Sequence, residues 1–254
     1  MKMVYRRVLL GLFIVVSAAL GAAPAALAMT VQPVVIDLTP GGRGMSQIVT
    51  VENTFTNPLP VELRVEDLTA SANGLTGTGK DSGDLLVFPP QAIIQPSQTQ
   101  TFRIQYVGDP ALATSKHYYV TIAQLPVKLP AGKSAIQILY NFRVLVSVAP
   151  LGVKPDLQVK SAEIGKNAKG EPIPVITVED ASTAYGYLSR GKLEITQRDA
   201  AGHEVFDKTL PGPELQQVIG FGLVSSGQTR RIAVPVVLPS AGGTLDVKFT
   251  PSSD

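Results

Sequence analysis

The chain has 254 residues, no cysteine, two histidines and a formal net charge of +2. Three of its 22 basic residues lie in the first seven positions, and the remaining 19 nearly balance the 20 acidic residues. This composition gives no indication of nucleic-acid binding, and it excludes thiol catalysis, cysteine-ligated metals and an ordinary histidine-based zinc cluster.

The first 28 residues have the pattern of a secretory signal peptide. Lys2, Arg6 and Arg7 precede an apolar run over residues 8–20, and the sequence Ala-Leu-Ala at 26–28 has the small-x-small form of a cleavage site. The alternative is a short membrane anchor, but the run is shorter than the roughly 20 residues that a span needs. We expect cleavage after Ala28 and a mature chain of about 226 residues without a membrane span.

The next part of the chain predicts a series of β-strands. Apolar and polar residues alternate in several segments separated by turns rich in proline and glycine. These segments cover residues 34–38, 47–52, 61–65, 100–107 and 118–125. About seven short strands with such turns are typical of an immunoglobulin-like sandwich, which we predict over residues 29–150.

Residues 136–148 predict an unusually long strand, compared with the usual length of about 5–6 residues. Its apolar face carries Ile136, Ile138, Tyr140 and Phe142, followed by valines at 144, 146 and 148, because side chains alternate along a strand. Arg143 lies on the opposite face, between two leucines. A strand this apolar either lies in the middle of a core or completes another protein.

A second set of strand-like runs follows a short linker at residues 151–155. The runs cover residues 175–178, 193–197, 205–210, 231–238 and 244–249. Turns separate them, including Pro211-Gly212-Pro213, and no segment has a helical period with caps. We predict a second, smaller sandwich over residues 155–254, which makes the fold class all-β with two immunoglobulin-like domains.

Residues 74–80 match the Gly-x-x-x-x-Gly-Lys part of a phosphate-binding loop. Asp81 stands where Ser or Thr would hold magnesium, and no strand–loop–helix setting surrounds the match. We interpret the segment as a polar loop between strands.

No combination of side chains predicts an active site. The candidate carboxylates and hydroxyls are scattered, without a nucleophile elbow or a zinc-protease helix: Glu179, Asp180, Glu194, Ser182 and Ser189. His117, beside two tyrosines, is better explained as a packing residue than as a base. We expect no enzyme activity, cofactor or metal.

Several short sequences resemble, in their order and spacing, the periplasmic chaperones of the chaperone–usher pilus pathway, the PapD-like family. They are VTVEN at 49–53, VFPPQ at 87–91, QTQTFRI at 98–104, YYVTIAQLP at 118–126 and the strand that ends at Pro150. The resemblance covers most of the mature chain and is strongest between residues 47 and 150. It implies two immunoglobulin-like domains at an angle with a cleft between them, and a periplasmic location.

The resemblance also implies a mechanism. A pilus subunit is a sandwich that lacks its last strand, and the chaperone lends a strand until an outer-membrane usher exchanges it for one from the next subunit. By position, Ile136, Ile138 and Tyr140 are the side chains expected to fill the subunit, with Phe142 next. Each such side chain contributes about 1.5–3 kcal/mol on full burial.

In relatives, two basic residues in the cleft hold the subunit's C-terminal carboxylate, and here the chain departs from their pattern. Residues 30–38 contain no Lys or Arg, and Leu145 stands near the position of the relatives' lysine. Arg103 and Arg143 are the best remaining candidates for the anchor, with Arg43 weaker. This departure, the lack of cysteine and the short loop at 126–134 resemble the archaic-type branch of the family.

Two other functions fit less well. An exported adhesin or pilus subunit would have a free donor extension near the mature N-terminus, whereas the residues from Thr30 onward have the pattern of an ordinary short strand. A secreted hydrolase has almost no support from the residues. An exposed apolar edge would also permit self-association of the free protein.

Overall fold

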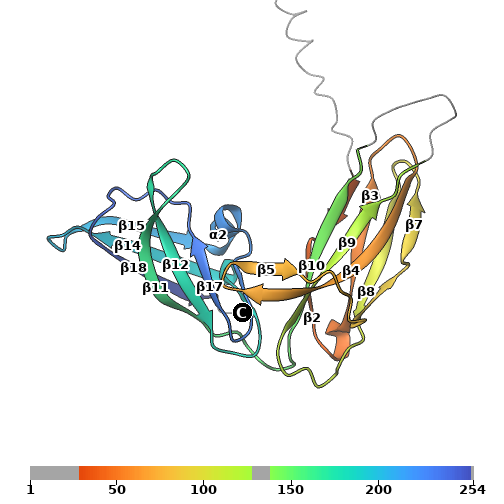
Figure 1. Cartoon of the computed structure of the whole chain (residues 1–254), viewed down its shortest axis with the longest axis horizontal. Helices are drawn as coiled ribbons and strands as arrows, with labels where there is room; N and C mark the ends of the chain where they lie inside the picture. Colours follow the sequence, from red (N-terminus) through yellow and green to blue (C-terminus); the bar gives the residue numbers. More distant parts are fainter. Residues whose placement is uncertain (1–28, 128–137, 253–254) are drawn as a thin grey trace, which may run out of the picture.

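The computed structural model describes residues 29–127 and 138–252, which form two β-domains set at an angle (Figure 1). Each domain has its own apolar core. The expected signal peptide and Ile136 lie outside the described residues. Within the described ranges, no helix has the length and hydropathy needed to cross a membrane.

The first domain consists of two sheets packed face to face. One has the strand order β1-β3-β8-β6, and the other has the order β2-β10-β9-β4-β5, with β7 also paired to β4. The bounds are β1 Met29–Gln32, β2 Val35–Leu38, β3 Ser46–Asn53, β4 Leu59–Ser71, β5 Gly74–Gly77, β6 Leu85–Phe88, β7 Gln91–Ile94, β8 Thr99–Tyr106, β9 Lys116–Gln124 and β10 Asn141–Val148, with a 3₁₀ turn, η1, at Gly42–Met45.

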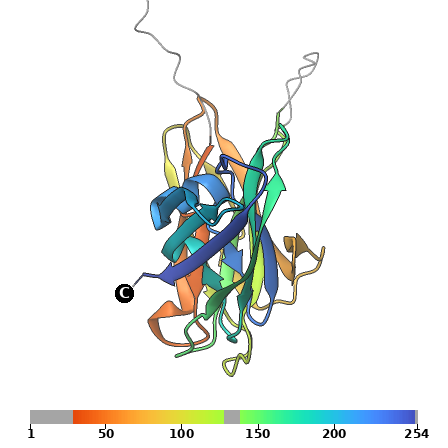
Figure 2. The same cartoon turned by 90° about the vertical axis from the view of Figure 1, so that its left-hand side faces the viewer.

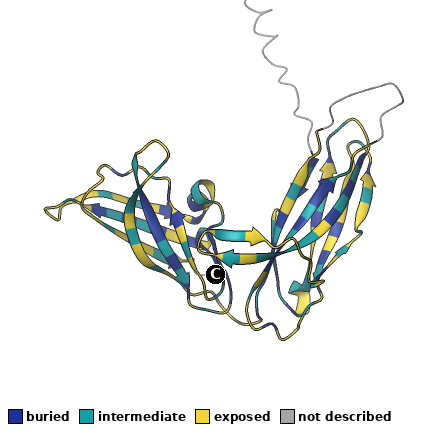
Figure 3. Cartoon of the chain, viewed as in Figure 1, coloured by how far each residue is buried: buried dark blue, intermediate teal, exposed yellow. Residues whose placement is uncertain are grey.

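Alternation builds the core of this domain, as the banding along its strands shows (Figure 3). In β10, Val144, Val146 and Val148 are fully buried and pack with inward residues of the facing sheet, among them Phe102 and Ile104 of β8. The sandwich predicted for this half of the chain is therefore present.

Two strands differ from their predicted extents. The strand predicted over residues 136–148 begins only at Asn141 as β10, and residues 138–140 precede it. The segment at 30–38 divides at Pro33 into β1, which pairs with β3, and β2, which pairs in parallel with β10. Proline has no backbone N–H to give a ladder, so Pro33 suits a point where the chain changes sheet.

The second domain contains sheets β11-β12-β17 and β15-β14-β18 and the short pair β13-β16. In Figure 2 this domain faces the viewer and the first domain lies behind it. The bounds are β11 Leu157–Lys166, β12 Pro172–Asp180, β13 Gly186–Tyr187, β14 Gly191–Arg198, β15 Glu204–Pro211, β16 Leu223–Val224, β17 Thr229–Ala233 and β18 Thr244–Pro251, with a 3₁₀ turn, η2, at Leu188–Arg190 and one α-helix, α2, at Gly212–Ile219.

Two local predictions were wrong. The turn expected at Pro211-Gly212-Pro213 instead starts α2, because a proline is tolerated in the first helical turn and Leu215 is buried in the core. The loop expected at residues 74–80 begins with β5, which forms a hairpin with the long strand β4. The tip of this hairpin reaches the second domain, where the Ala72 carbonyl accepts a hydrogen bond of 3.0 Å from the Arg231 amide (Figure 1).

Candidate functional site

Strand β10 has an open edge along its first half. Its whole length is paired with β9, but on the other side β2 covers only Leu145–Val148. The last bond on that side runs from the Leu145 amide to the Val34 carbonyl at 2.9 Å. Since the chain turns away at Pro33, no strand of the described residues pairs with this edge from Asn141 to Val144. Unpaired backbone groups at a sheet edge are a template for a strand from another chain.

Exposed apolar side chains continue the line of β10 beyond its first residue. Ile138 is 70% exposed and Tyr140 is 39% exposed. The Tyr140 carbonyl accepts a 3.0 Å bond from the Gln124 amide, and its ring lies 5.9 Å from that of Phe55. Phe142 is partly buried against the domain core. The predicted donor side chains thus pass from exposed to partly buried as the chain enters β10, with Ile136 outside the described residues.

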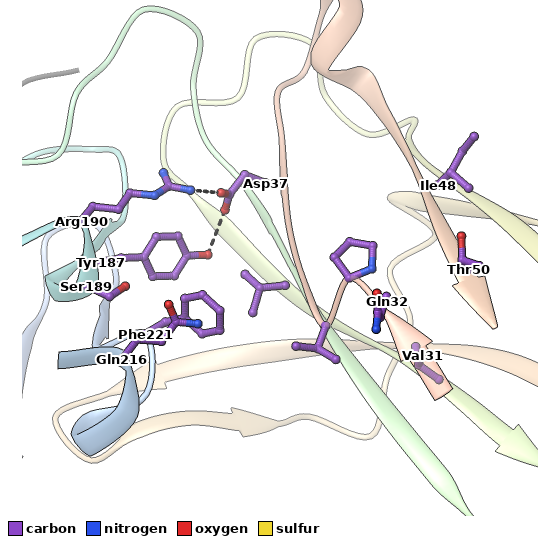
Figure 4. Close-up of a pocket in the computed structure, with 13 residues that line it drawn as sticks. Val31, Gln32, Asp37, Ile48, Thr50, Tyr187, Ser189, Arg190, Gln216 and Phe221 are labelled. Carbon is purple, nitrogen blue, oxygen red and sulfur yellow. Dashed lines mark hydrogen bonds and ion pairs between the residues drawn. The ribbon is translucent and has the colours of Figure 1, made fainter. Parts of the chain in front are cut away.

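A cleft of about 890 Å³ lies between the domains next to this edge. Figure 4 shows its two walls: the β1–β2 bend with part of β3 on one side, and η2, α2 and the residue after Gly220 on the other. Apolar groups line both walls, including Val34 and Phe221. The charged groups that line it are Asp37 and Arg190, which form an ion pair with each other.

Asp37 is the centre of a polar cluster that joins the domains. Its carboxylate accepts hydrogen bonds from the hydroxyls of Tyr185 at 2.6 Å and Tyr187 at 2.9 Å, besides its pair with Arg190. Burial, together with the Asp37 charge, raises the pKa of Tyr187 above its ordinary value, so its hydroxyl stays a donor. The Arg190 guanidinium also lies 4.8 Å from the centre of the Tyr187 ring.

Asp37 belongs to a row of three polar residues across the sheet. Ser147 of β10 is paired with Asp37 of β2 on one side and with His117 of β9 on the other. His117 is buried, with Nδ1 2.8 Å from the Ser147 hydroxyl and Nε2 2.8 Å from the hydroxyl of Ser225 in the second domain. The interpretation of His117 as a packing residue omitted these polar partners. Through Asp37 and His117, the row Asp37–Ser147–His117 forms the polar contacts of this sheet with the second domain.

The arginines predicted as a carboxylate anchor lie on different sheets. Arg143 is exposed on the outer face of β10, with its guanidinium 5.5 Å from the centre of the Tyr119 ring. Arg103 is exposed on the outer face of β8, in the facing sheet. Because both point outward from opposite sheets, the sandwich separates them, and one carboxylate cannot contact both. Arg43 lies in η1.

Sequence patterns did not reveal the residues that line the cleft from the second domain. Tyr187, Arg190 and Phe221 lie in or next to short irregular segments, and Gln216 lies on the unpredicted helix α2. Alternation shows only that Asp37 points away from the core between Ile36 and Leu38. It does not show which distant residues meet it.

Comparisons with known proteins agree with this architecture. Residues 28–154, half of the chain, match the family model for the pili and flagellar-assembly chaperone, PapD N-terminal domain. The class 5 fimbriae chaperone CfaA is similar in structure, with a TM-score of 0.52 at 12% identity over 89% of this chain and 93% of that chain. A CFA/I chaperone–tip adhesin complex gives a TM-score of 0.52 at 13% identity over the same shares, and the YadV chaperone gives 0.51 at 16% over 87% and 91%.

At these identities the structural likeness shows the fold alone, and no curated protein matches the chain. The match to the family model covers the whole first domain, with both sheets, the open edge of β10 and the β1–β2 bend that leaves this edge free. The chain belongs to the family of pili and flagellar-assembly chaperones that the PapD N-terminal domain defines.

Proposed function

We propose that the chain binds pilus or fimbrial subunits in the periplasm by donating the edge of β10, without a catalytic step. The observation that carries this proposal is the open edge at Asn141–Val144, preceded by the exposed apolar side chains of Ile138 and Tyr140. A subunit strand added there would close the backbone hydrogen bonds, while alternate side chains of the donated segment enter the subunit's core. The donor residues of this proposal are Ile136, Ile138, Tyr140 and Phe142.

The alternative, that the chain is itself a pilus subunit or adhesin, has less support. A subunit needs a free donor extension near its N-terminus, whereas Met29–Gln32 forms β1 of the chain's own sheet, paired with β3. In the first domain of this chain, the two sheets also face each other, and Val49, Val51 and Phe102 between them are fully buried.

Arg143 is the anchor candidate that this proposal keeps. It lies on β10 about 7 Å along the strand from Leu145, which packs against the tyrosine cluster at the domain joint. No carboxylate of the described ranges forms an ion pair with it. A subunit whose strand follows β10 would bring its C-terminus close to this guanidinium.

Co-expression with exported proteins encoded beside this chain tests the function. We expect the full chain to co-purify with a subunit and to keep it soluble. Arg143→Ala should lower the recovered subunit several-fold, since a charge-assisted hydrogen bond contributes about 1.5–3 kcal/mol when desolvated. Lys80→Ala removes an exposed cation that follows the β4–β5 hairpin, and it should have no effect. Equal recovery with Arg143→Ala and Lys80→Ala would remove Arg143 from the site, and no recovery with the wild-type chain would count against the function.

We further propose that the outer face of the other sheet docks on an outer-membrane usher. Arg103 is paired across the sheet with Ile48 of β3 and Phe88 of β6, and these two apolar side chains are 54% and 67% exposed. The row lies on the sheet that does not contain β10, and Arg103 and Phe88 lie outside the cleft that Ile48 lines, so these two would stay accessible while a subunit occupies the donor edge. Exposed apolar side chains around a cation are typical of a docking surface.

Arg103→Glu should separate the two steps. We expect this variant to retain its subunit at the wild-type level and to lose most of its binding to usher in detergent, measured by pull-down of the chaperone–subunit complex. The charge reversal places like charges against an acidic partner group, which costs several kcal/mol at an interface. Lys169→Glu, on an exposed turn of the second domain, is the matched control. Undiminished usher binding by Arg103→Glu would exclude this face.

A further inference from the structure

The joint between the two domains contains one histidine that is buried between hydroxyl groups from both of them. His117 is 4% exposed, and each of its ring nitrogens lies 2.8 Å from a serine hydroxyl. Ser147 belongs to the strand next to His117, whereas Ser225 follows β16 in the second domain. The ring of Tyr185, also from the second domain, meets the imidazole edge-on at 5.3 Å.

Both contacts suit a neutral imidazole. A neutral ring has one N–H donor and one acceptor nitrogen, and serine hydroxyls can serve either role. A protonated ring donates from both nitrogens, which both serine oxygens can accept, so the obstacle to protonation is the charge that the closed joint would bury. Burial lowers the pKa of His117 to about 4, with the Asp37 charge acting in the opposite direction.

The charged groups around His117 do not neutralise an added proton. From β2, Asp37 already accepts from two tyrosines and pairs with Arg190. From β4 the paired residue is Leu68, from β10 it is Ser147, and the second domain contributes Ser225 and Tyr185, none of which is a carboxylate. On the open side, Lys116 and Asp84 are held by each other at 2.7 Å, and Asp67, which lines the same groove, accepts hydrogen bonds from the Ser82 amide and hydroxyl.

We propose that His117 is a proton-sensitive joint: when its imidazole takes up a proton, the contact with Ser225 opens and the angle between the two domains changes. The contact between His117 and Ser147 is fixed by the ladder between β9 and β10. Of the two serine contacts, the one with Ser225, across the domain boundary, is therefore the one that can open. A groove of about 650 Å³ that His117 and Ser225 both line gives water a path to the charged ring.

The sign of the effect follows from linkage. Because the pKa of His117 in the closed joint lies below its ordinary value of 6.5, the opened state binds the proton more readily. The closed joint is therefore fully stable above about pH 6.5 and loses stability as the pH falls through about 4. The proposal concerns the free chain and does not depend on which subunit it binds.

The absence of cysteine makes the joint measurable. Thr56→Cys in the first domain and Lys169→Cys in the second introduce two exposed label sites, whose distance can be followed by spin-label or fluorescence spectroscopy between pH 8 and 3.5. We expect a change in distance with a midpoint between about pH 4 and 6.5, while circular dichroism shows both domains still folded. His117→Gln keeps a donor and an acceptor but cannot titrate in this range, so it should remove the change or shift its midpoint by about one pH unit or more.

His203→Gln is the matched control, because the other histidine lies exposed on a turn of the second domain and should leave the profile unchanged. If His117→Gln fails to fold, the imidazole C–H signals of the wild-type chain still test the proposal, because only two histidines contribute. Titration of the buried imidazole together with the distance change would support the joint. The same distance profile in His117→Gln and wild type, or titration without any change in distance, would overturn it.

Discussion

Replacing Ile138 and Tyr140 together with aspartate is expected to leave the chain folded and to abolish recovery of its subunit from the periplasm. The two side chains are 70% and 39% exposed, so the core that Val144 and Val146 help to form does not depend on them. In a complex, each would contribute about 1.5–3 kcal/mol on burial. The loss of both corresponds to a decrease in affinity of about 10²- to 10⁴-fold, at about 1.4 kcal/mol for each factor of ten. Burial of the new carboxylates would add to this loss.

Circular dichroism and urea unfolding of the double variant, together with the yield of co-purified subunit, check this expectation. A matched control replaces two exposed valines of the second domain, Val205 and Val237, with aspartate. This control should fold and retain the subunit. Unfolding of the Ile138/Tyr140 variant would show that residues 138–140 belong to the chain's own core. Wild-type recovery of the subunit by a folded variant would mean that another edge makes the complex.

The sequence predicted the two sandwiches because alternation is a local property. Val144, Val146 and Val148 are inward for the same reason that Ser147 is outward, and no knowledge of distant strands is needed. The donor residues come from the resemblance to pilus chaperones and stay a prediction; the described residues show that Ile138 and Tyr140 are exposed ahead of the domain's own ladder. The true start of β10, at Asn141, depends on where the partner strand β9 ends, and alternation does not contain that information.

The relations between distant residues could not be predicted. Arg103 and Arg143 lie in similar sequence settings, but they point outward from opposite sheets, and sheet membership depends on the whole topology. The helix α2 was missed because Pro-Gly-Pro is a strong turn signal, and burial of Leu215 overrides it. The cluster around Asp37 joins residues about 150 positions apart, without periodicity or motif.

Asp37→Ala is expected to lower the free energy of unfolding by about 3 kcal/mol and to loosen the joint between the domains. The Asp37 carboxylate accepts from two tyrosine hydroxyls, and Tyr185 and Tyr187 are both buried. Hydrogen bonds to a charged group contribute about 1.5–3 kcal/mol each, and a buried donor without a partner costs about 1–3 kcal/mol. The ion pair with Arg190 adds little, because the arginine side chain is 65% exposed.

Two domains need not unfold in one step, so the loss should be measured where it arises. The chain has no tryptophan, so tyrosine fluorescence follows urea unfolding, with Tyr185 and Tyr187 of the cluster among its seven tyrosines. Asp37→Asn keeps an oxygen acceptor for the tyrosines and should lose less stability than Asp37→Ala. Asp246→Ala, an exposed aspartate on β18, should lose almost none. A loss equal to that of Asp246→Ala would mean that the hydrogen bonds at Asp37 do not hold the domains. A full loss with an unchanged distance between the domain labels would place their effect inside the first domain, since Asp37 lies on its strand β2.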